Sequence, residues 1–204
     1  MYTGIVQGNY PVKNVVNKPG LLTFEIELPQ EMLTDIKIGA SVASDGVCLT
    51  VSKINGQTLS FDAMEETLNK TTLGGLKEGS RVNIERSASM GDEIGGHIMA
   101  GHVTGMAEIV RIDRPENNHV ITFKVPLEWM KYILQKGFVA LDGCSLTVTD
   151  PNKTNGTFSV HLIPETLRQT SFGWKQVGDK VNVELDNRTQ VIVDTVEAYL
   201  KDIK

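Results

Sequence analysis

Short runs in which polar and apolar residues alternate dominate the chain and predict an all-β protein. In residues 23–28, Thr-Phe-Glu-Ile-Glu-Leu, the two classes alternate strictly, as they do on a strand with one buried face. Residues 119–125 alternate in the same way. Further short strands are predicted at 42–43, 49–54, 59–63 and 82–86, with turn signals at 44–46, 55–56, 74–75 and 155–156. Strands at this spacing indicate a small closed barrel or a sandwich.

Two segments have helical rather than strand character. Residues 127–134, before Gly137, predict a short helix. Residues 189–204 predict a longer helix with Asp186 or Asn187 as its N-cap, because apolar residues recur at helical spacing at Ile192, Val196, Tyr199, Leu200 and Ile203. The pattern leaves open whether this helix docks on its own barrel or pairs with the same helix of another subunit.

The sequence contains an internal duplication. Residues 42–51 (VASDGVCLTV) and 139–148 (VALDGCSLTV) are identical at seven of ten positions. Residues 66–85 and 165–184 are identical at nine of twenty. The offset between the copies changes from 97 to 99, which places two extra residues of the second copy near 151–156.

A fainter third match aligns the first six residues with 99–104. The three blocks occur in the same order, and a period near 98 residues is too long for a solenoid. We therefore expect a duplicated small domain, with one barrel at 1–97, a second at 98–188 and a terminal helix at 189–204.

Composition and charge restrict the class of protein. With 40% hydrophobic and 22% charged residues, the 204-residue chain has the composition of a soluble globular protein. The net charge of −5 makes non-specific nucleic-acid binding a poor expectation. No apolar run reaches the roughly 18 residues of a membrane helix, and the first ten residues do not resemble a signal peptide. Two cysteines, Cys48 and Cys144, then indicate reduced thiols of a cytoplasmic protein.

The duplicated motifs resemble those of the riboflavin synthase family. They are MYTGIV, DGVCLTV, EIGGHIMAGHVTG, DGCSLTV, VHLIPETL and VNVELD, in this order, and the resemblance covers essentially the whole chain. The family usually carries Phe at the second position, where this chain has Tyr2. If this ring lies in an apolar pocket, its hydroxyl needs a hydrogen-bond partner.

The resemblance implies a fold, an assembly and a reaction. Each half would be a six-stranded Greek-key barrel that binds one 6,7-dimethyl-8-ribityllumazine. The C-terminal helices would assemble a homotrimer, with each active site between the N-terminal barrel of one subunit and the C-terminal barrel of its neighbour.

The implied reaction is the last step of riboflavin biosynthesis, a transferase reaction without cofactor or metal. One lumazine gives a four-carbon unit to another, and the products are riboflavin and 5-amino-6-(D-ribitylamino)uracil. The sequence leaves open whether lumazine synthase associates with the protein.

The two copies differ at positions that the resemblance places near the reacting rings. Cys48 aligns with Ser145, Gly4 aligns with His102, and Asp186 replaces a serine of the first copy. A dismutation needs one substrate deprotonated and the other activated as an electrophile, so the pockets should be chemically unequal. The resemblance implies that Ser145 adds to C7 or orients a nucleophile there, that His102 and Cys48 transfer protons, and that Asp186 orients or accepts a proton.

The resemblance also implies two lumazine pockets, each completed by the start of the other copy. Backbone groups would read the edges of the rings, and polar side chains would bind the ribityl hydroxyls. One pocket would use Cys48, Leu49, Thr50, Asp62, Ala63, Met64, Glu65, Glu66, Thr67, Gly101, His102 and Val103. The other would use Gly4, Ile5, Val6, Lys136, Ser145, Leu146, Thr147, His161, Leu162, Ile163, Pro164, Glu165 and Thr166, and Tyr2 would also contact the substrate.

Ordinary structural roles compete with these interpretations. A lone cysteine such as Cys48 on an apolar strand commonly fills a core, and Cys144, which aligns with a valine, keeps that interpretation. His97 and His102 do not have a helical zinc spacing, and no third ligand lies nearby. His119 is predicted to be a solvated loop residue.

Two other classes of protein share this kind of barrel. Lumazine proteins, which are fluorescent antennae, keep one working pocket and lose motifs of the second half. Here the motifs of both halves are retained, which favours the enzyme. An electron-transfer flavoprotein domain is disfavoured because the sequence has no Rossmann-type nucleotide domain.

Overall fold

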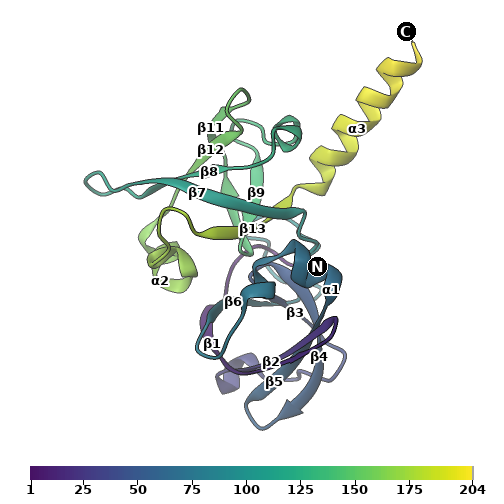
Figure 1. Cartoon of the computed structure of the whole chain (residues 1–204), viewed down its shortest axis with the longest axis vertical. Helices are drawn as coiled ribbons and strands as arrows, with labels where there is room; N and C mark the ends of the chain where they lie inside the picture. The colour runs from purple at the N-terminus through teal and green to yellow at the C-terminus, as the bar shows by residue number, and fades with distance from the viewer. Residues whose placement is uncertain (204) are drawn as a thin grey trace.

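The computed structural model describes residues 1–203 as two barrels, one above the other, with a helix projecting from the second (Figure 1). Six strands close the first barrel in the order β1-β2-β5-β4-β3-β6. Strand β2 pairs with β5 rather than with β3, which is a Greek-key connection. The strands are β1 (Gly8–Lys18), β2 (Leu21–Glu27), β3 (Ser41–Ser44), β4 (Val47–Asn55), β5 (Thr58–Met64) and β6 (Arg81–Arg86). Single turns of helix connect them at η1 (Gln30–Met32), α1 (Glu65–Lys70) and η2 (Thr72–Gly75).

The second half repeats this topology with one strand interrupted. Its sheet has the order β10-β9-β13-β7-β8-β12-β11. The strands are β7 (Gly105–Asp113), β8 (Val120–Lys124), β9 (Phe138–Leu141), β10 (Cys144–Thr147), β11 (Thr149–Asn152), β12 (Thr157–His161) and β13 (Lys180–Leu185). The connecting turns are η3 (Leu127–Lys131), α2 (Pro164–Gln169) and η4 (Ser171–Gly173).

Strands β10 and β11 together take the place of β4. Only Val148 separates them, so the chain itself joins the two ends of this sheet. Asp150 has a φ of +49° and Pro151 has no N–H to donate, and the pairing of β11 with β12 shifts there. The predicted fold class is therefore confirmed, with seven strands rather than six in the second half.

The predicted strands are present, and the copies differ in length where the sequence indicates. Two residues, 56–57, separate β4 from β5, whereas four, 153–156, separate β11 from β12. The segment at 127–134 is shorter than predicted, since only η3 is helical.

Each core is built around one cross-strand pair of phenylalanines. Phe24 and Phe61 have ring centroids 5.5 Å apart, and Phe123 and Phe158 have theirs 5.6 Å apart. All four side chains are fully buried. The duplication therefore preserves the centre of the core together with the topology.

The prediction that His119 is solvated is wrong. Its side chain is 9% exposed, and Nε2 has no hydrogen-bond partner among the described residues. His119 precedes β8 and is a loop residue as predicted, but it is buried rather than solvated, and its carbonyl accepts from the N–H of Leu162 next to the β8–β12 pairing. Burial lowers the pKa of the imidazole.

Helix α3 (Asn187–Asp202) leaves the body of the protein (Figure 1). Asp186 is its N-cap, as predicted, and accepts hydrogen bonds from the N–H and the hydroxyl of Thr189 at 3.0 and 2.6 Å. Lys131 holds the helix to η3 through ion pairs with Asp194 and Glu197 at 2.9 and 2.7 Å. The final predicted helical residue, Lys204, lies outside the described residues.

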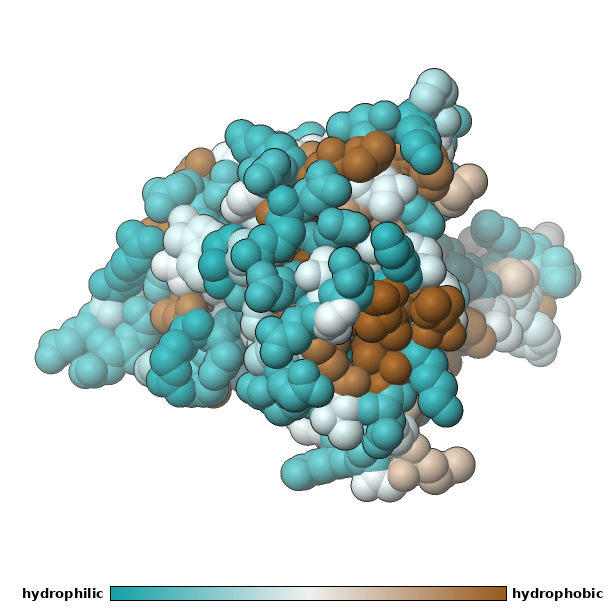
Figure 2. Space-filling model, turned by 90° about the horizontal axis from the view of Figure 1, so that it is seen from below, coloured by the Kyte–Doolittle hydropathy of each residue, from teal (hydrophilic) through white to brown (hydrophobic). Residues whose placement is uncertain are grey.

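The apolar face of α3 is not docked on its own barrel. Side chains between 51% and 67% exposed form this face: Val191, Ile192, Val196, Tyr199, Leu200 and Ile203. The face seen from below in Figure 2 is mostly hydrophilic, with hydrophobic side chains in one larger group and several smaller ones. In the part of the chain that is described, no helix combines the length and the apolar character needed to span a membrane.

Candidate functional site

The two barrels meet at their duplicated Asp-Gly turns. A Cβ at Gly46 would lie 2.7 Å from the backbone nitrogen of Gly143, and a Cβ at Gly143 would lie 3.0 Å from that of Gly46. Both glycines also have positive φ, at +77° and +83°. Only glycine permits this conformation and this close approach together.

Two asparagines, one from each copy, stabilise this contact, because each donates a hydrogen bond to the Asp-Gly turn of the other copy. Asn83 Nδ2 donates to the carbonyl of Asp142 at 2.9 Å, and Asn182 Nδ2 donates to the carbonyl of Asp45 at 2.9 Å. Both side chains are 1% exposed. The repeated Val-Asn pairs and Asp-Gly turns therefore form one pseudo-twofold interface, which fixes the barrels relative to each other. Lys175 adds an unduplicated ion pair to Asp142 at 2.9 Å.

The first residues of each copy form an arm that crosses to the other barrel. The N–H of Ser145 donates to the carbonyl of Gly4, and the N–H of Cys48 donates to the carbonyl of Gly101, both at 2.9 Å. Between the arms, Tyr2 and Met99 exchange two backbone hydrogen bonds of 2.9 and 3.0 Å. The crossing that the resemblance implies is thus present in the backbone.

This geometry corrects the alignment of the arms. Gly4 and Gly101 are the equivalent residues, with φ of +77° and +79°, so the counterpart of His102 is Ile5 rather than Gly4. The offset here is 97, as in the first block. The faint match between the arms is too short to fix the offset to within one residue.

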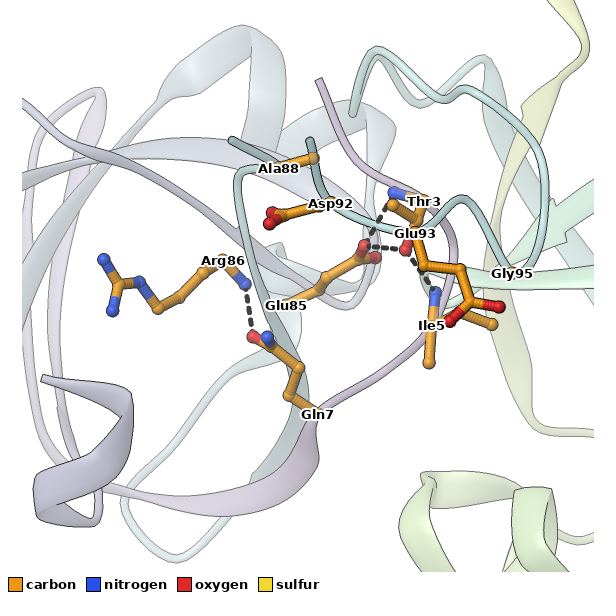
Figure 3. Close-up of a pocket in the computed structure, with 9 residues that line it drawn as sticks. All are labelled: Thr3, Ile5, Gln7, Glu85, Arg86, Ala88, Asp92, Glu93 and Gly95. Atoms are coloured by element: carbon orange, nitrogen blue, oxygen red, sulfur yellow. Dashed lines mark hydrogen bonds between the residues drawn. The ribbon is translucent and has the colours of Figure 1, made fainter. Parts of the chain in front are cut away.

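Two buried glutamates clamp the arms, and the sequence analysis did not identify them. Glu85 accepts from the N–H of Thr3 at 2.7 Å, from its hydroxyl at 2.9 Å and from the N–H of Gly4 at 3.2 Å (Figure 3). Glu184 accepts from the N–H groups of Ala100 and Gly101 at 2.7 and 2.9 Å. Burial raises the pKa of both carboxyl groups, while the backbone donors oppose this effect. The duplication could have identified these glutamates, since each of them ends a copy of the repeated Val-Asn-x-Glu motif.

A cavity of about 310 Å³ opens where the N-terminal arm meets β10. Its predicted lining residues are Gly4, Ile5, Val6, Ser145, Leu146, Ile163, Glu165 and Thr166. Four lining residues were not predicted: Gln7, Cys144, Gln169 and Thr170. The predicted residues that do not line it are Lys136, Thr147, His161, Leu162 and Pro164.

Cys144 reaches this cavity wall although the sequence indicated a core residue. Its side chain is 3% exposed, and burial raises the pKa of the thiol well above its ordinary value. The thiol is therefore held in its neutral form, and its buried position agrees with the predicted packing role.

Ser145 is paired with a histidine that the sequence analysis left without a role. Nδ1 of His97 lies 2.6 Å from Oγ of Ser145. The imidazole is 8% exposed and stacks on Phe138 with the ring centroids 5.2 Å apart. Burial lowers its pKa, while the nearby charge of Asp186 opposes the shift. His97 is therefore a neutral hydrogen-bonding partner at neutral pH.

The equivalent position in the first barrel carries a different pair. The hydroxyl of Tyr2 donates to Sγ of Cys48 at 3.1 Å. Tyr2 is 1% exposed, so the predicted need for a hydroxyl partner is met by the thiol. Burial and this hydrogen bond raise the pKa of Tyr2, which keeps the phenol protonated.

The remaining predicted catalytic residues lie on or beside the arms. His102 is exposed and follows Gly101, whose backbone Glu184 holds. Asp186 caps α3 and is electrostatically coupled to His97. Burial alone would raise the pKa of Asp186, but its hydrogen bonds from Thr189 and Arg188 give a net lowering. It is therefore ionised at neutral pH.

The other predicted residues of the N-terminal pocket lie on neighbouring strands and on α1. Asp62 accepts a hydrogen bond from the hydroxyl of Thr23 at 2.6 Å. Leu49, Ala63 and Val103 are buried, whereas the side chains of Thr50, Asp62, Met64, Glu65 and Glu66 are exposed and that of Thr67 is half-buried. In a single chain this pocket therefore presents its polar side chains to solvent.

A second cavity, of about 480 Å³, lies beside the same arm (Figure 3). Ile5 and Gln7 line both cavities, so the arm forms part of the wall of each. Gln7 also accepts from the N–H of Arg86 at 2.7 Å, which ties the arm to β6. Three carboxylates, Glu85, Asp92 and Glu93, contribute to this cavity.

Comparison with known proteins agrees with this arrangement. The family model for the lumazine binding domain matches residues 3–87 and again residues 100–186. Riboflavin synthase of Escherichia coli strain K12 is 52% identical over 201 residues, which are 98% of this chain and 93% of that protein. Riboflavin synthase of Buchnera aphidicola subsp. Schizaphis graminum is 45% identical, over 98% of this chain and 96% of its own.

Solved structures are similar to the chain as well. LumP complexed with riboflavin has a TM-score of 0.84 and 26% identity, and LumP complexed with 6,7-dimethyl-8-(1′-D-ribityl)lumazine has a TM-score of 0.81 and 26% identity. Each alignment covers 92% of this chain and the whole of the solved one. With both repeats matched and full-length relatives at up to 52% identity among those compared, the chain belongs to the lumazine-binding-domain family of riboflavin synthases.

Proposed function

We propose that this protein catalyses the dismutation of two molecules of 6,7-dimethyl-8-ribityllumazine. One substrate transfers a four-carbon unit to the other, giving riboflavin and 5-amino-6-(D-ribitylamino)uracil. The observation that carries the proposal is the full-length similarity to riboflavin synthases combined with two arms that each complete the opposite barrel. Two similar but unequal pockets suit a reaction in which two identical molecules play different roles.

Positioning supplies much of the expected rate enhancement. Holding two reactants in register can contribute up to ~7–11 kcal/mol of the barrier in favourable cases. The pseudo-twofold interface of buried asparagines and Asp-Gly turns keeps the two barrels in one arrangement. This rigid frame fixes how each subunit presents its two barrels to its neighbours, where the two rings would meet.

We assign the two lumazine pockets to the predicted groups of residues around Cys48 and around Ser145. The cavity beside Ser145 supports this assignment, because eight of its lining residues belong to the predicted set. Its volume of about 310 Å³ is at the lower end of the range for small-molecule pockets. A neighbouring subunit would enlarge and enclose it.

A fluorescent antenna without catalysis is the alternative function. Two observations favour the enzyme: the relatives named riboflavin synthase reach 52% identity, whereas the LumP structures reach 26%. The second copy also retains Ser145 and the segment 161–166, which the antenna proteins are expected to lose.

The direct test is incubation of the purified protein with the lumazine. We expect riboflavin absorbance and fluorescence to rise until one riboflavin has formed for every two lumazines consumed. Stoichiometric binding without any riboflavin would instead identify an antenna protein.

We further propose a homotrimer in which α3 supplies subunit contacts and each active site is shared between subunits. The apolar face of α3 supports this proposal, because six large side chains along it are at least 51% exposed in the single chain. Removal of residues 189–204 should convert the trimer to smaller species in analytical ultracentrifugation and lower the turnover. An unchanged trimer would exclude this role for α3.

Two expectations about the cellular setting stay predictions. We expect the protein to act in the cytoplasm, and association with lumazine synthase is open to test by co-sedimentation. Neither affects the proposed chemistry.

A further inference from the structure

Nδ1 of His97 and Oγ of Ser145 form a hydrogen bond of 2.6 Å, and the tautomer of the imidazole decides which of the two atoms donates. When the imidazole carries its proton on Nε2, the Ser145 hydroxyl donates and Nδ1 accepts. Acceptance at Nδ1 requires the neutral imidazole with its proton on Nε2, and burial favours the neutral form.

The imidazole and the backbone that carries it are both held beside Ser145. Phe138 stacks on the ring, and the N–H of His97 donates to the carbonyl of Thr3 in the N-terminal arm at 3.1 Å. A Cβ at Gly96 would lie 2.6 Å from Cβ of Ser145, so the chain before His97 lies close against β10.

The charged groups that act on His97 come from the junction of β13 and α3. Asp186 favours its protonated form, and Arg188 disfavours it. The N-terminal arm, β9 and β10 contribute the uncharged neighbours Thr3, Phe138 and Ser145.

At the equivalent position of the other barrel, the hydrogen bond runs in the opposite direction. There the sulfur of Cys48 accepts a hydrogen bond from Tyr2, so the thiol proton is the group left to donate. When Nδ1 of His97 accepts the hydrogen bond of the Ser145 hydroxyl, the oxygen lone pairs are what Ser145 presents to the cavity. Two backbone positions related by the duplication thus offer an acceptor in one pocket and a donor in the other.

We propose that His97 is a positioning residue. By accepting from the Ser145 hydroxyl, it directs the hydroxyl proton away from the bound ring, so that Ser145 in the C-terminal pocket offers a hydrogen-bond acceptor to the substrate. Ser145 Oγ then accepts a hydrogen bond from a water or hydroxyl group held at the lumazine. The N-terminal pocket offers the Cys48 S–H in its place. This inference rests on the proposed function and assigns the chemical difference between its two pockets.

The test uses His97→Ala, His97→Asn, Ser145→Ala and the double variant in the full chain. We expect His97→Ala to lower kcat about 10- to 100-fold, while lumazine affinity, measured by fluorescence titration, stays within about threefold. The double variant should be no slower than Ser145→Ala, because His97 acts through that hydroxyl. Asn places its amide oxygen near the position of Nδ1, so His97→Asn should recover most of the activity.

A pH profile separates this role from simple packing. Wild-type kcat should fall on the acid side as His97 becomes protonated, at a pH below the ordinary value of about 6.5. His97→Asn cannot titrate and should lose this acid limb. Cys48→Ala is the matched control at the other pocket. Its fold-loss of kcat should multiply with that of His97→Ala in the variant that combines the two substitutions.

Three results would overturn the inference: full activity in His97→Ala, independent losses in the double variant with Ser145→Ala, or an acid limb that persists in His97→Asn. Thermal unfolding of each variant identifies a folding defect, and His97→Asn then carries the test. If the wild type forms no riboflavin, the proposed function fails by itself. Nitrogen NMR of His97 still decides the inference, since a proton found on Nδ1 contradicts it.

Discussion

The two junctions between an arm and the opposite barrel share one backbone arrangement and differ in their side chains. In both, an arm glycine with positive φ accepts from a strand residue, and a buried glutamate holds the arm. The strand residue is Cys48 with a tyrosine donor at one junction and Ser145 with a histidine partner at the other. Duplication conserved the positions, while substitution at a few of them made the junctions unequal.

This contrast shows which parts of a duplicated site can diverge. At the Asp-Gly turns two backbones meet with no spare room, since an added Cβ at Gly46 would lie 2.7 Å from the backbone nitrogen of Gly143. The clamps are glutamate carboxylates that accept from backbone N–H groups of the arms. Tyr2 and His97, the partners of Cys48 and Ser145, do not occupy equivalent positions in the two copies, since Tyr2 pairs with Met99. The turns and clamps are therefore symmetric between the copies, whereas the side chains around Cys48 and Ser145 are not.

The largest effect is expected from removing a reacting group in either pocket. Ser145→Ala and His102→Gln should each lower turnover about 100- to 1,000-fold, because proton handling is lost. Ligand affinity should change far less. Steady-state kinetics with a fluorescence titration measure both quantities, and equal losses of turnover and affinity would mean that these residues only bind.

Filling the space at an arm glycine should have the next largest effect. In Gly101→Ala, the new Cβ would lie 2.6 Å from Cβ of Cys48, and φ of +79° is unfavourable for alanine. We expect a loss of about 2–4 kcal/mol from crowding and backbone strain, measured by urea unfolding. Gly79→Ala is the matched control, with φ of +82° and open space around it, and it should lose only the strain part. Equal losses in both variants would remove close approach as the reason for this glycine.

The interface asparagines should contribute equally if the pseudo-twofold frame is symmetric. Asn182→Ala removes the donors to the Asp45 carbonyl and to Thr72 Oγ1, and it leaves buried groups unpaired. Asn83→Ala removes the donors to the Asp142 carbonyl and to Ser171 Oγ, and also the acceptor of the Ser171 N–H. We expect each to cost about 1–3 kcal/mol of unfolding free energy. A loss in one variant alone would show that the interface is carried by one copy.

The smallest effect is expected at Tyr2. Tyr2→Phe removes the hydroxyl that donates to Cys48 and leaves a sulfur, a weak acceptor, without a partner. Stability should change by less than about 1 kcal/mol, and turnover should stay within about threefold. A much larger drop in turnover would mean that the orientation of the Cys48 thiol matters to the reaction.

Much of the fold was predictable because local patterns and the duplication agree. Alternation at 23–28 fixed a strand with one buried face, and the 97-residue offset between DGVCLTV and DGCSLTV required the same strand and turn in each half. Asp186 was predictable as a cap because the helical pattern begins directly after it. These features depend on residues close together in the chain.

The candidate site was predictable only in part. Ser145 and the arm residues were implied by the family resemblance, and eight of the implied residues line one cavity. His97, Glu85 and Glu184 were missed, since their partners lie 48, 82 and 84 residues away. The burial of His119 was missed for a similar reason, because pairing with β12 covers it. The shift in the pairing of β11 with β12 was not predicted either; it lies at Asp150, whose φ is +49°.

The sequence by itself determined that the protein has two copies of one β-domain, a terminal amphipathic helix and unequal residues at matched positions. Tertiary structure alone decided that the arms cross, that Glu85 and Glu184 clamp them, and that Ser145 pairs with His97 while Cys48 accepts from Tyr2. The reason is physical. Periodicity and repetition record which face of a strand is buried, whereas a hydrogen bond between distant segments exists only after the two barrels have packed against each other.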